Sequence, residues 1–444
     1  MLMETILSVG IDLGTSTTQM ILSRLQVENT ASAFVVPRME IVGREVLYRS
    51  EIYFTPLLSA DTIDADGVRE IISSEYKKAG IRPSDIQTGA VIITGETARK
   101  ENAREVLTAL VDLAGDFVVA TAGPALESIL AARGAGADRM AKEKGRYVLH
   151  MDIGGGTSNL ALFDPQGKLV DTGCLNVGGR LLKFDPDGRL NYISPVLKGM
   201  RTDDPRSLAK ELAEILEQAA GLKQMDDRLQ RMITDKMVTL PNEPVLVSFS
   251  GGVADLISRQ EDDWLRYGDL GVLLGNAIAN SKLCAGEYLL GKETIRATVI
   301  GAGSYSTELS GSTIFYRNVE FPIHNLPVVC LQDGNGEEIK EKTAVYGTDP
   351  VALFLQGLEN PTFRRISQLA DQIADSPLQK PLVVVVEQDM AKALGQALML
   401  RLEQHVPLLC MDGIHIPPGS YLDVAAPVAG GTAVPVIIKT LAFE

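Results

Sequence analysis

The fold is decided by Ser8-Val9-Gly10-Ile11-Asp12-Leu13-Gly14-Thr15-Ser16-Thr17-Thr18, an apolar run that ends in glycine and hydroxyl residues. The apolar residues from Ile6 onward predict a buried strand, and Gly14 predicts its end. Glycine lets backbone N–H groups approach an anion closely, and a carboxylate such as Asp12 can hold a hydrated Mg²⁺. The same Asp-Leu-Gly-Thr sequence is also typical of a simple hairpin turn, so this stretch alone does not decide between the two interpretations.

The pattern occurs a second time. Met151-Asp152-Ile153-Gly154-Gly155-Gly156-Thr157-Ser158-Asn159 follows an apolar strand and precedes another, and Asp152 stands 140 residues after Asp12 (152 − 12). A simple turn has no reason to recur with its carboxylate, glycine and hydroxyl residues in the same order. The repeat therefore favours two similar domains that close on the phosphates of one magnesium nucleotide.

Composition narrows the class of protein. The chain has 444 residues, of which 45% are hydrophobic and 22% charged, and its net charge is −15. These values are typical of a globular protein with two or three domains, and the negative charge argues against nucleic-acid binding. No apolar run approaches the roughly 20 residues of a membrane-spanning helix. Glu4 stands where a signal peptide would be basic, so a cytoplasmic protein that does not enter a membrane is expected.

Cysteine and histidine residues indicate neither disulfides nor a metal cluster. The four cysteines lie far apart without a CxxC pair, and the four histidines show no ligand spacing. Free thiols in a reducing compartment are the simpler interpretation.

Three more glycine junctions follow predicted strands. Gly178 and Gly179 serve either a tight turn or a ligand, and the two interpretations are equal in weight. Gly251 and Gly252 follow the apolar run over 245–249, and Gly301 and Gly303 follow a run over 298–300 that predicts another strand. Such junctions are frequent in α/β proteins, but the last two and the two hairpins together make four glycine junctions, which suit a site around a nucleotide.

The order of these motifs resembles that of the actin, sugar-kinase and heat-shock-chaperone ATPase superfamily. Residues 8–18 and 148–163 resemble its two phosphate motifs, 119–133 and 298–311 its connecting motifs, and 245–256 its adenosine motif. The resemblance implies an α/β fold with two duplicated ribonuclease-H-like domains around a nucleotide cleft. It gives a first actin-like domain over 1–135, a second over 136–315 and an extra C-terminal α/β module over 316–444.

The resemblance also implies site residues. Asp12 and Asp152 would be catalytic and would hold the waters bound to Mg²⁺ of ATP. The phosphates and the adenosine would be held by Gly14, Thr15, Ser16, Thr17, Gly154, Gly155, Gly156, Thr157, Gly178, Gly179, Gly251, Gly252, Gly301 and Gly303. The chaperone ATPases carry a glutamate where this chain has Gly123. Glu127 is near enough to replace it as the base that positions water, or is a surface carboxylate, so slow ATP hydrolysis is expected. The chain has no GxxxxGK[ST] loop, which argues against a Walker-type ATPase.

The last 130 or so residues extend beyond actin. They predict strands over 327–331, 382–386, 407–411 and 434–441, and helices over 349–356, 363–375 and 389–402. With this module included, the chain resembles the reactivating factors of ethanolamine ammonia-lyase. The stretches that carry this resemblance are 11–18, 94–104, 121–136, 151–159, 301–312, 382–398 and 430–443.

This family resemblance implies a chaperone that uses ATP and Mg²⁺ to exchange damaged cobalamin in the lyase for intact adenosylcobalamin. The lyase and a nucleotide are the expected partners, a homodimer is left open, and association with the ethanolamine-utilisation microcompartment is implied by the pathway alone. The DxHxxG signature of cobalamin proteins is absent, and Asp412 and His415 have the wrong spacing. We therefore expect the lyase, and not this chain, to hold the cobalamin.

Two alternatives of other classes share the fold. An actin-like filament or scaffold would assemble with ATP and scatter light. A small-molecule kinase would need an acceptor and a general base opposite the γ-phosphate, and Glu96 and Glu127 are the candidates.

Overall fold

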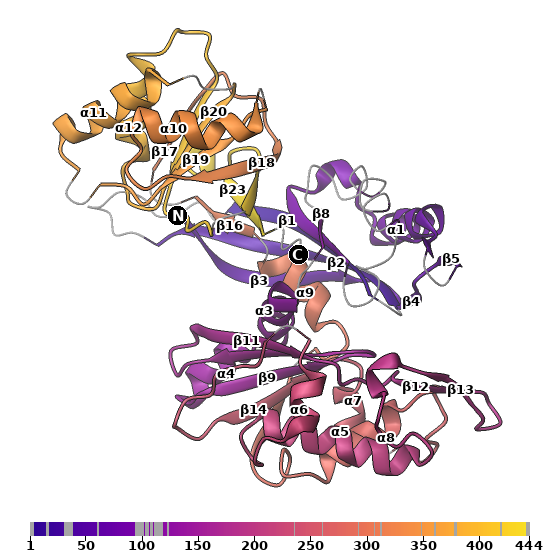
Figure 1. The fold of residues 1–444 in the computed structure, drawn as a ribbon. Helices are drawn as coiled ribbons and strands as arrows, with labels where there is room; N and C mark the ends of the chain where they lie inside the picture. Colours follow the sequence, from indigo (N-terminus) through magenta and orange to yellow (C-terminus); the bar gives the residue numbers. More distant parts are fainter. Residues whose placement is uncertain are drawn as a thin grey trace.

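The structure is a computed structural model of the chain. The structure describes residues 4–14, 17–30, 39–59, 62–93, 102, 106, 110, 119–121, 124–234, 236–259, 261–291, 293–305, 307–310, 313–347, 349–358, 361–376, 380–417 and 420–440. Figure 1 shows two α/β units joined near α3 and α9, with a third unit at the opposite side of the first.

The first sheet is built around β1, which contains the opening motif. Its strand order is β3-β2-β1-β7-β8, and β4 pairs with β2. β1 is antiparallel to β2 and parallel to β7. Asp64 caps the N-terminus of helix α1, its side chain accepting from Gly67 N, and Gly80 in a left-handed conformation caps the C-terminus. The elements of this unit are β1 (Glu4–Leu13), β2 (Thr17–Asn29), β3 (Met39–Arg49), β4 (Tyr53–Phe54), β5 (Leu57–Ser59), β6 (Thr62–Ile63), α1 (Ala65–Ala79), β7 (Thr88–Ile93) and β8 (Val119–Thr121).

The second sheet repeats this topology. Its order is β11-β10-β9-β14-β15, with β9 antiparallel to β10 and parallel to β14. Because β9 occupies the place of β1, the two phosphate motifs lie at equivalent positions of duplicated sheets. This duplication is the actin-like ATPase fold that the resemblance implied. The elements are β9 (Val148–Ile153), β10 (Ser158–Phe163), β11 (Leu169–Leu175), β12 (Leu182–Phe184), β13 (Leu190–Ile193), α5 (Pro205–Ala219), α6 (Asp227–Met232), β14 (Leu246–Ser250), α7 (Ala254–Ser258), α8 (Gly271–Ala279) and β15 (Tyr288–Leu290).

Two helices connect the duplicated units. α3 (Pro124–Ala135) is followed by α4 (Ala137–Lys144) and packs on β9, β10 and β11, whereas α9 (Ala297–Tyr305) packs on β1, β2 and β7. Each helix therefore leaves one unit and packs on the sheet of the other, and α3 and α9 cross each other between them (Figure 1). The strand predicted over 298–300 is wrong, because these residues form the first half of α9.

The C-terminal module is an eight-stranded sheet in the order β16-β23-β22-β18-β19-β20-β21-β17. Strands β18 to β21 are parallel. α10, α11 and α12 contribute to the apolar core on one face, around Leu353, Val384 and Leu394. The elements are β16 (Thr307–Leu309), β17 (Ile314–Arg317), β18 (Ile323–Cys330), α10 (Gly336–Thr343), β19 (Ala352–Leu355), α11 (Phe363–Ala374), β20 (Leu382–Val386), α12 (Ala391–Met399), β21 (Leu408–Asp412), β22 (Ser420–Val424) and β23 (Pro435–Thr440).

This module is attached to the first unit through apolar packing. Val428 and Ala433 pack with Ile6 and Leu25 of the first sheet. The helix predicted over 349–356 is wrong, because its buried apolar residues form the parallel strand β19. Within the described part of the chain, no helix has the length and apolar character needed to cross a membrane.

Candidate nucleotide-binding site

The two phosphate motifs form the same turn. Gly14 N donates to the carbonyl oxygen of Thr17 at 2.9 Å, and Gly154 N donates to that of Thr157 at 2.9 Å. Asp12 and Asp152 each lie on the strand that enters the turn and are 8% and 7% exposed. Two nearly buried carboxylates at equivalent strand ends are the arrangement that the repeat predicted.

A buried amide lies across from each carboxylate. Asp12 pairs with Gln19 in the β1–β2 register, and Asp152 pairs with Asn159 in the β9–β10 register. Gln19 is 3% and Asn159 2% exposed, and among the described residues neither Gln19 Oε1 nor Asn159 Oδ1 has a hydrogen-bond partner. A buried amide oxygen without a donor is costly. An amide oxygen of this kind, beside a carboxylate, is suited to accept a hydrogen bond from water bound to a hard cation such as Mg²⁺.

Hydroxyl groups hold Asp152 from two directions. Ser250 Oγ of β14 donates to Asp152 Oδ1, and Thr298 Oγ1 of α9 lies 3.5 Å from Asp152 Oδ2. Burial raises the pKa of Asp152 to about 6, against the effect of these two hydrogen bonds. The charged form of a desolvated carboxylate of this kind is strongly stabilised by a cation at its exposed edge.

A buried imidazole lies behind Ser250. His150 is fully buried, with Nε2 2.8 Å from Ser250 Oγ and Nδ1 2.8 Å from Ser248 Oγ. Burial lowers the pKa of His150 to about 3, so the ring is neutral at physiological pH.

The glycine loop of the second motif is supported by the segment 178–180. Gly179 N donates to Gly154 O at 3.0 Å, and Arg180 N donates to Gly155 O at 2.6 Å. A Cβ on Gly178 would lie 2.3 Å from Gly155 O, so close packing explains this glycine. The Arg180 side chain lies against Gly155 and pairs with Asp269, with Nε 3.3 Å from Oδ2. A partly exposed guanidinium therefore lies beside the candidate phosphate loop.

The predicted adenosine junction packs on the same strand end. Gly251 has φ +90°, and a Cβ there would lie 2.3 Å from Ile153 O, so only glycine fits. Gly252 is exposed, and a Cβ on it would meet no atom within 4 Å. Gly251 N donates to Thr294 O at 3.0 Å, which connects this loop to the segment that leads into α9.

Gly301 and Gly303 lie inside α9 and not at the end of a strand. A Cβ on Gly301 would lie 2.0 Å from Leu130 O of α3, and one on Gly303 would lie 2.9 Å from Gly10 N of β1. Helix packing accounts for both glycines, and their contact with a nucleotide stays a prediction. α9 itself touches both motifs, since Thr298 faces Asp152 and Gly303 faces Gly10.

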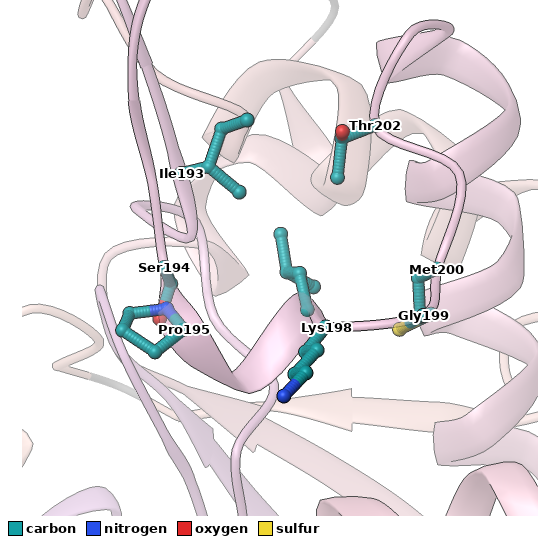
Figure 2. A pocket seen from close by; sticks show the side chains of 8 residues that line it. Ile193, Ser194, Pro195, Lys198, Gly199, Met200 and Thr202 are labelled. Atoms are coloured by element: carbon teal, nitrogen blue, oxygen red, sulfur yellow. The ribbon is translucent and has the colours of Figure 1, made fainter.

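Other possible sites are less convincing. In the described residues no group of three or more His, Cys, Asp and Glu side chains forms a metal cluster. A shallow pocket of about 400 Å³ lies in the loop after β13. Figure 2 shows Ile193 and Thr202 on its opposite sides and Lys198 below them. It contains none of the predicted site residues.

The comparisons with known proteins decide the family. The model of the family described as "Ethanolamine utilisation protein EutA" matches residues 4–444. The chain belongs to this family. Ethanolamine ammonia-lyase reactivase EutA of Salmonella typhimurium is 39% identical over 462 aligned residues, which cover 99% of this chain and 98% of that protein. The protein of the same name from Escherichia coli K12 is 38% identical over 470 aligned residues, with the same coverage.

Among solved structures, the PPX-GPPA enzyme of Aquifex aeolicus is similar with a TM-score of 0.42 and 12% identity. The match covers 67% of this chain and 99% of that one. The fold of this EutA-family chain is assigned from its own strand order, which is the same in the two sheets.

Four residues that the sequence of this EutA-family chain singled out are not part of the site described above. Thr15 and Ser16, together with Gly123, fall outside the described residues. Glu127 is in the first turn of α3 and is half-buried. Sequence reasoning missed Gln19, Asn159, His150, Ser250 and Arg180. The signal for most of them is a polar residue that alternates with apolar ones inside a buried strand.

Proposed function

We propose that this chain is a reactivating factor for ethanolamine ammonia-lyase that uses ATP and Mg²⁺ to promote exchange of damaged cobalamin for intact adenosylcobalamin. The observation that carries the proposal is full-length membership of the EutA family, with 39% identity over 99% of the chain to a relative named as the reactivase of that lyase.

The nucleotide site proposed for this activity uses the twin hairpins. Asp12 and Asp152 would hold waters of Mg²⁺, with the amide oxygens of Gln19 and Asn159 beside them. The loops over 14–17 and 154–157 would bind the phosphates through backbone N–H groups other than those of Gly14 and Gly154, which close the two turns, and the adenosine would lie near Gly251 and Gly252. Bound Mg²⁺ supplies positive charge that neutralises the phosphates. The roles of Thr15, Ser16 and Thr17, of Gly178 and Gly179, and of Glu127 as a water-positioning base belong to the same proposal.

The contacts of the segment 293–296, which leads into α9, suggest how nucleotide binding acts on the rest of the molecule. Arg49 of β3 pairs with Glu293 at 2.6 Å, and Arg296 donates to Ser50 O at 3.1 Å. The same segment accepts a hydrogen bond from Gly251 N through Thr294 O. A nucleotide that binds both hairpins more tightly in one arrangement of the domains shifts the population toward it. That arrangement would bind the lyase in an opened form that releases the spent cofactor.

Partners and location are proposed with the same activity. The lyase is the client and keeps the cobalamin, and this chain acts through protein–protein contact. A homodimer, a cytoplasmic location and association with the ethanolamine-utilisation microcompartment also stay proposals.

Reactivation tests the proposal directly. Ethanolamine ammonia-lyase is inactivated with bound cyanocobalamin, and this protein, Mg-ATP and free adenosylcobalamin are added while ammonia release is followed. We expect recovery only when both the protein and ATP are present. Absence of recovery, with lyase that regains activity when its apoenzyme is reconstituted, would refute the proposal. ATP-dependent light scattering, or phosphate transfer to a small acceptor, would then favour the filament or the kinase.

A further inference from the structure

The register of β9 and β14 places four polar side chains in line inside an otherwise apolar sheet. His150 lies beside Ser248, and Asp152 lies beside Ser250. His150, Ser248 and Ser250 are fully buried, and Asp152 is 7% exposed. Buried polar groups need partners, and here each serves as the partner of the next.

The direction of each hydrogen bond follows from the chemistry of the end groups. Asp152 as a carboxylate only accepts, so Ser250 Oγ uses its single proton to donate to Oδ1. Ser250 Oγ must then accept from Nε2–H of His150 at 2.8 Å. A neutral imidazole with a proton on Nε2 has Nδ1 free to accept, and Ser248 Oγ donates to it at 2.8 Å.

We propose that Ser250, oriented by His150, fixes the carboxylate of Asp152 in the rotamer that faces the magnesium nucleotide. The inference rests on the proposed nucleotide site and adds two positioning residues to it. Ser250 holds one oxygen of Asp152 from the second sheet and Thr298 holds the other from α9. The carboxylate is therefore held in one orientation before the nucleotide binds, so binding does not have to order the Asp152 side chain.

The strand offers a matched control. Ser248 and Ser250 lie on the same strand, are equally buried and contact the same imidazole, but only Ser250 reaches Asp152. Ser248→Ala and Ser250→Ala therefore each remove one buried hydroxyl beside the imidazole, but only Ser250→Ala removes a contact to Asp152. If the line of hydrogen bonds served only to satisfy buried groups, neither substitution would change the Mg²⁺-dependent gain in nucleotide affinity.

The test measures the affinity for a fluorescent ATP analogue with Mg²⁺ and with EDTA, together with the melting temperature. We expect Ser250→Ala to lose about tenfold in affinity with Mg²⁺ and little with EDTA, since charge-assisted hydrogen bonds are the strong ones. Ser248→Ala should keep the Mg²⁺-dependent gain in affinity, and both alanine variants should melt below the parent because each leaves a buried polar group without its partner. Ser250→Cys, which keeps a side chain of the same branching but is a weak donor, should lose the Mg²⁺-dependent gain as Ser250→Ala does and covers the case that the alanine variant does not fold.

Two outcomes would overturn the inference, and they distinguish failure of the positioning role from failure of the nucleotide site. Equal Mg²⁺-dependent gains in the parent chain, Ser248→Ala and Ser250→Ala would show that Ser250 has no positioning role, with the nucleotide site intact. Failure of the parent chain to bind the analogue at all would remove the nucleotide site and the inference together.

Discussion

Gly134 of α3 and Gly301 of α9 lie where the two helices cross, and neither position has room for a Cβ. A Cβ on Gly134 would lie 1.9 Å from Ala297 O and 2.8 Å from Gly301 N, and one on Gly301 would lie 2.0 Å from Leu130 O. Because α3 packs on the second sheet and α9 on the first, this contact is where the two duplicated units are joined.

Alanine at either glycine should therefore force the helices apart. We expect Gly134→Ala and Gly301→Ala to lower stability by on the order of 2 kcal/mol, the usual cost of overpacking, as measured by the thermal unfolding midpoint. Gly286→Ala is the control, since a Cβ there would meet nothing within 4 Å. Melting of all three variants at the parent temperature would contradict the close crossing.

The two carboxylates of the hairpins should act on the nucleotide and not on folding. Asp12→Asn and Asp152→Asn keep the side-chain shape, so we expect both variants to fold while their affinity for nucleotide loses its Mg²⁺ dependence. The loss should be about tenfold or more, in line with removal of a charged partner. Titration calorimetry with and without Mg²⁺ measures it, and Asp262→Asn, at an exposed residue of the second unit, is the control. A variant with full ATP-dependent activity would show that its carboxylate does not hold the metal.

A substitution at Gly156 should change phosphate binding without a change in stability. A Cβ on Gly156 would meet no atom within 4 Å, so Gly156→Ala should melt as the parent does. If phosphates approach the backbone of this loop, the added methyl group lies in their path, and nucleotide affinity should fall roughly tenfold, equivalent to about 1.4 kcal/mol. Unchanged affinity in a binding titration would place the phosphates elsewhere.

The sequence predicted the parts of the molecule that local patterns determine. The strand–glycine–hydroxyl motifs at Asp12 and Asp152 form equivalent hairpins. The residues Thr298, Val299 and Ile300 have strand propensity, but they form helix because α9 buries Val299 and Ile300 on the first sheet. Tertiary packing overrides local preference at that point.

The environment of Asp152 could not be predicted in the same way. It depends on the register between β9 and β14, whose hydrogen-bonded residues His150 and Ser248 are 98 positions apart. A single sequence contains the alternation of polar residues in each strand but not the pairing between them. The same limit applies to Arg180 and Asp269, which are 89 positions apart.

Arg180 should contribute to phosphate binding with little effect on stability. Its ion pair with Asp269 is partly exposed, and such pairs contribute at most about 1 kcal/mol. We expect Arg180→Met to lower nucleotide affinity about five- to tenfold through loss of a guanidinium beside the phosphate loop. Arg189→Met removes an exposed arginine that pairs with Asp187 in the same unit, and it should bind nucleotide as the parent does. Equal affinities of the two variants would argue against a phosphate contact.

Glu338 should give the C-terminal module a distinct pH dependence. Although burial acts to raise its pKa, hydrogen bonds from Lys342 and from the backbone N–H groups of Gln332, Asp333 and Gly334 lower the pKa from its ordinary value of 4.5 to about 2. A lowered carboxyl pKa means that the stabilisation is present above about pH 4.5 and is lost as the pH falls toward 2. Glu338→Gln should thus be less stable than the parent by up to about 3 kcal/mol at pH 7, since one pKa unit is about 1.4 kcal/mol. The difference should narrow between pH 4.5 and pH 2 in urea unfolding followed at several pH values. Glu341→Gln, on the exposed side of the same helix, is the control. If the stability difference between Glu338→Gln and the parent did not depend on pH, the carboxylate charge of Glu338 would not be what stabilises the loop over 332–334.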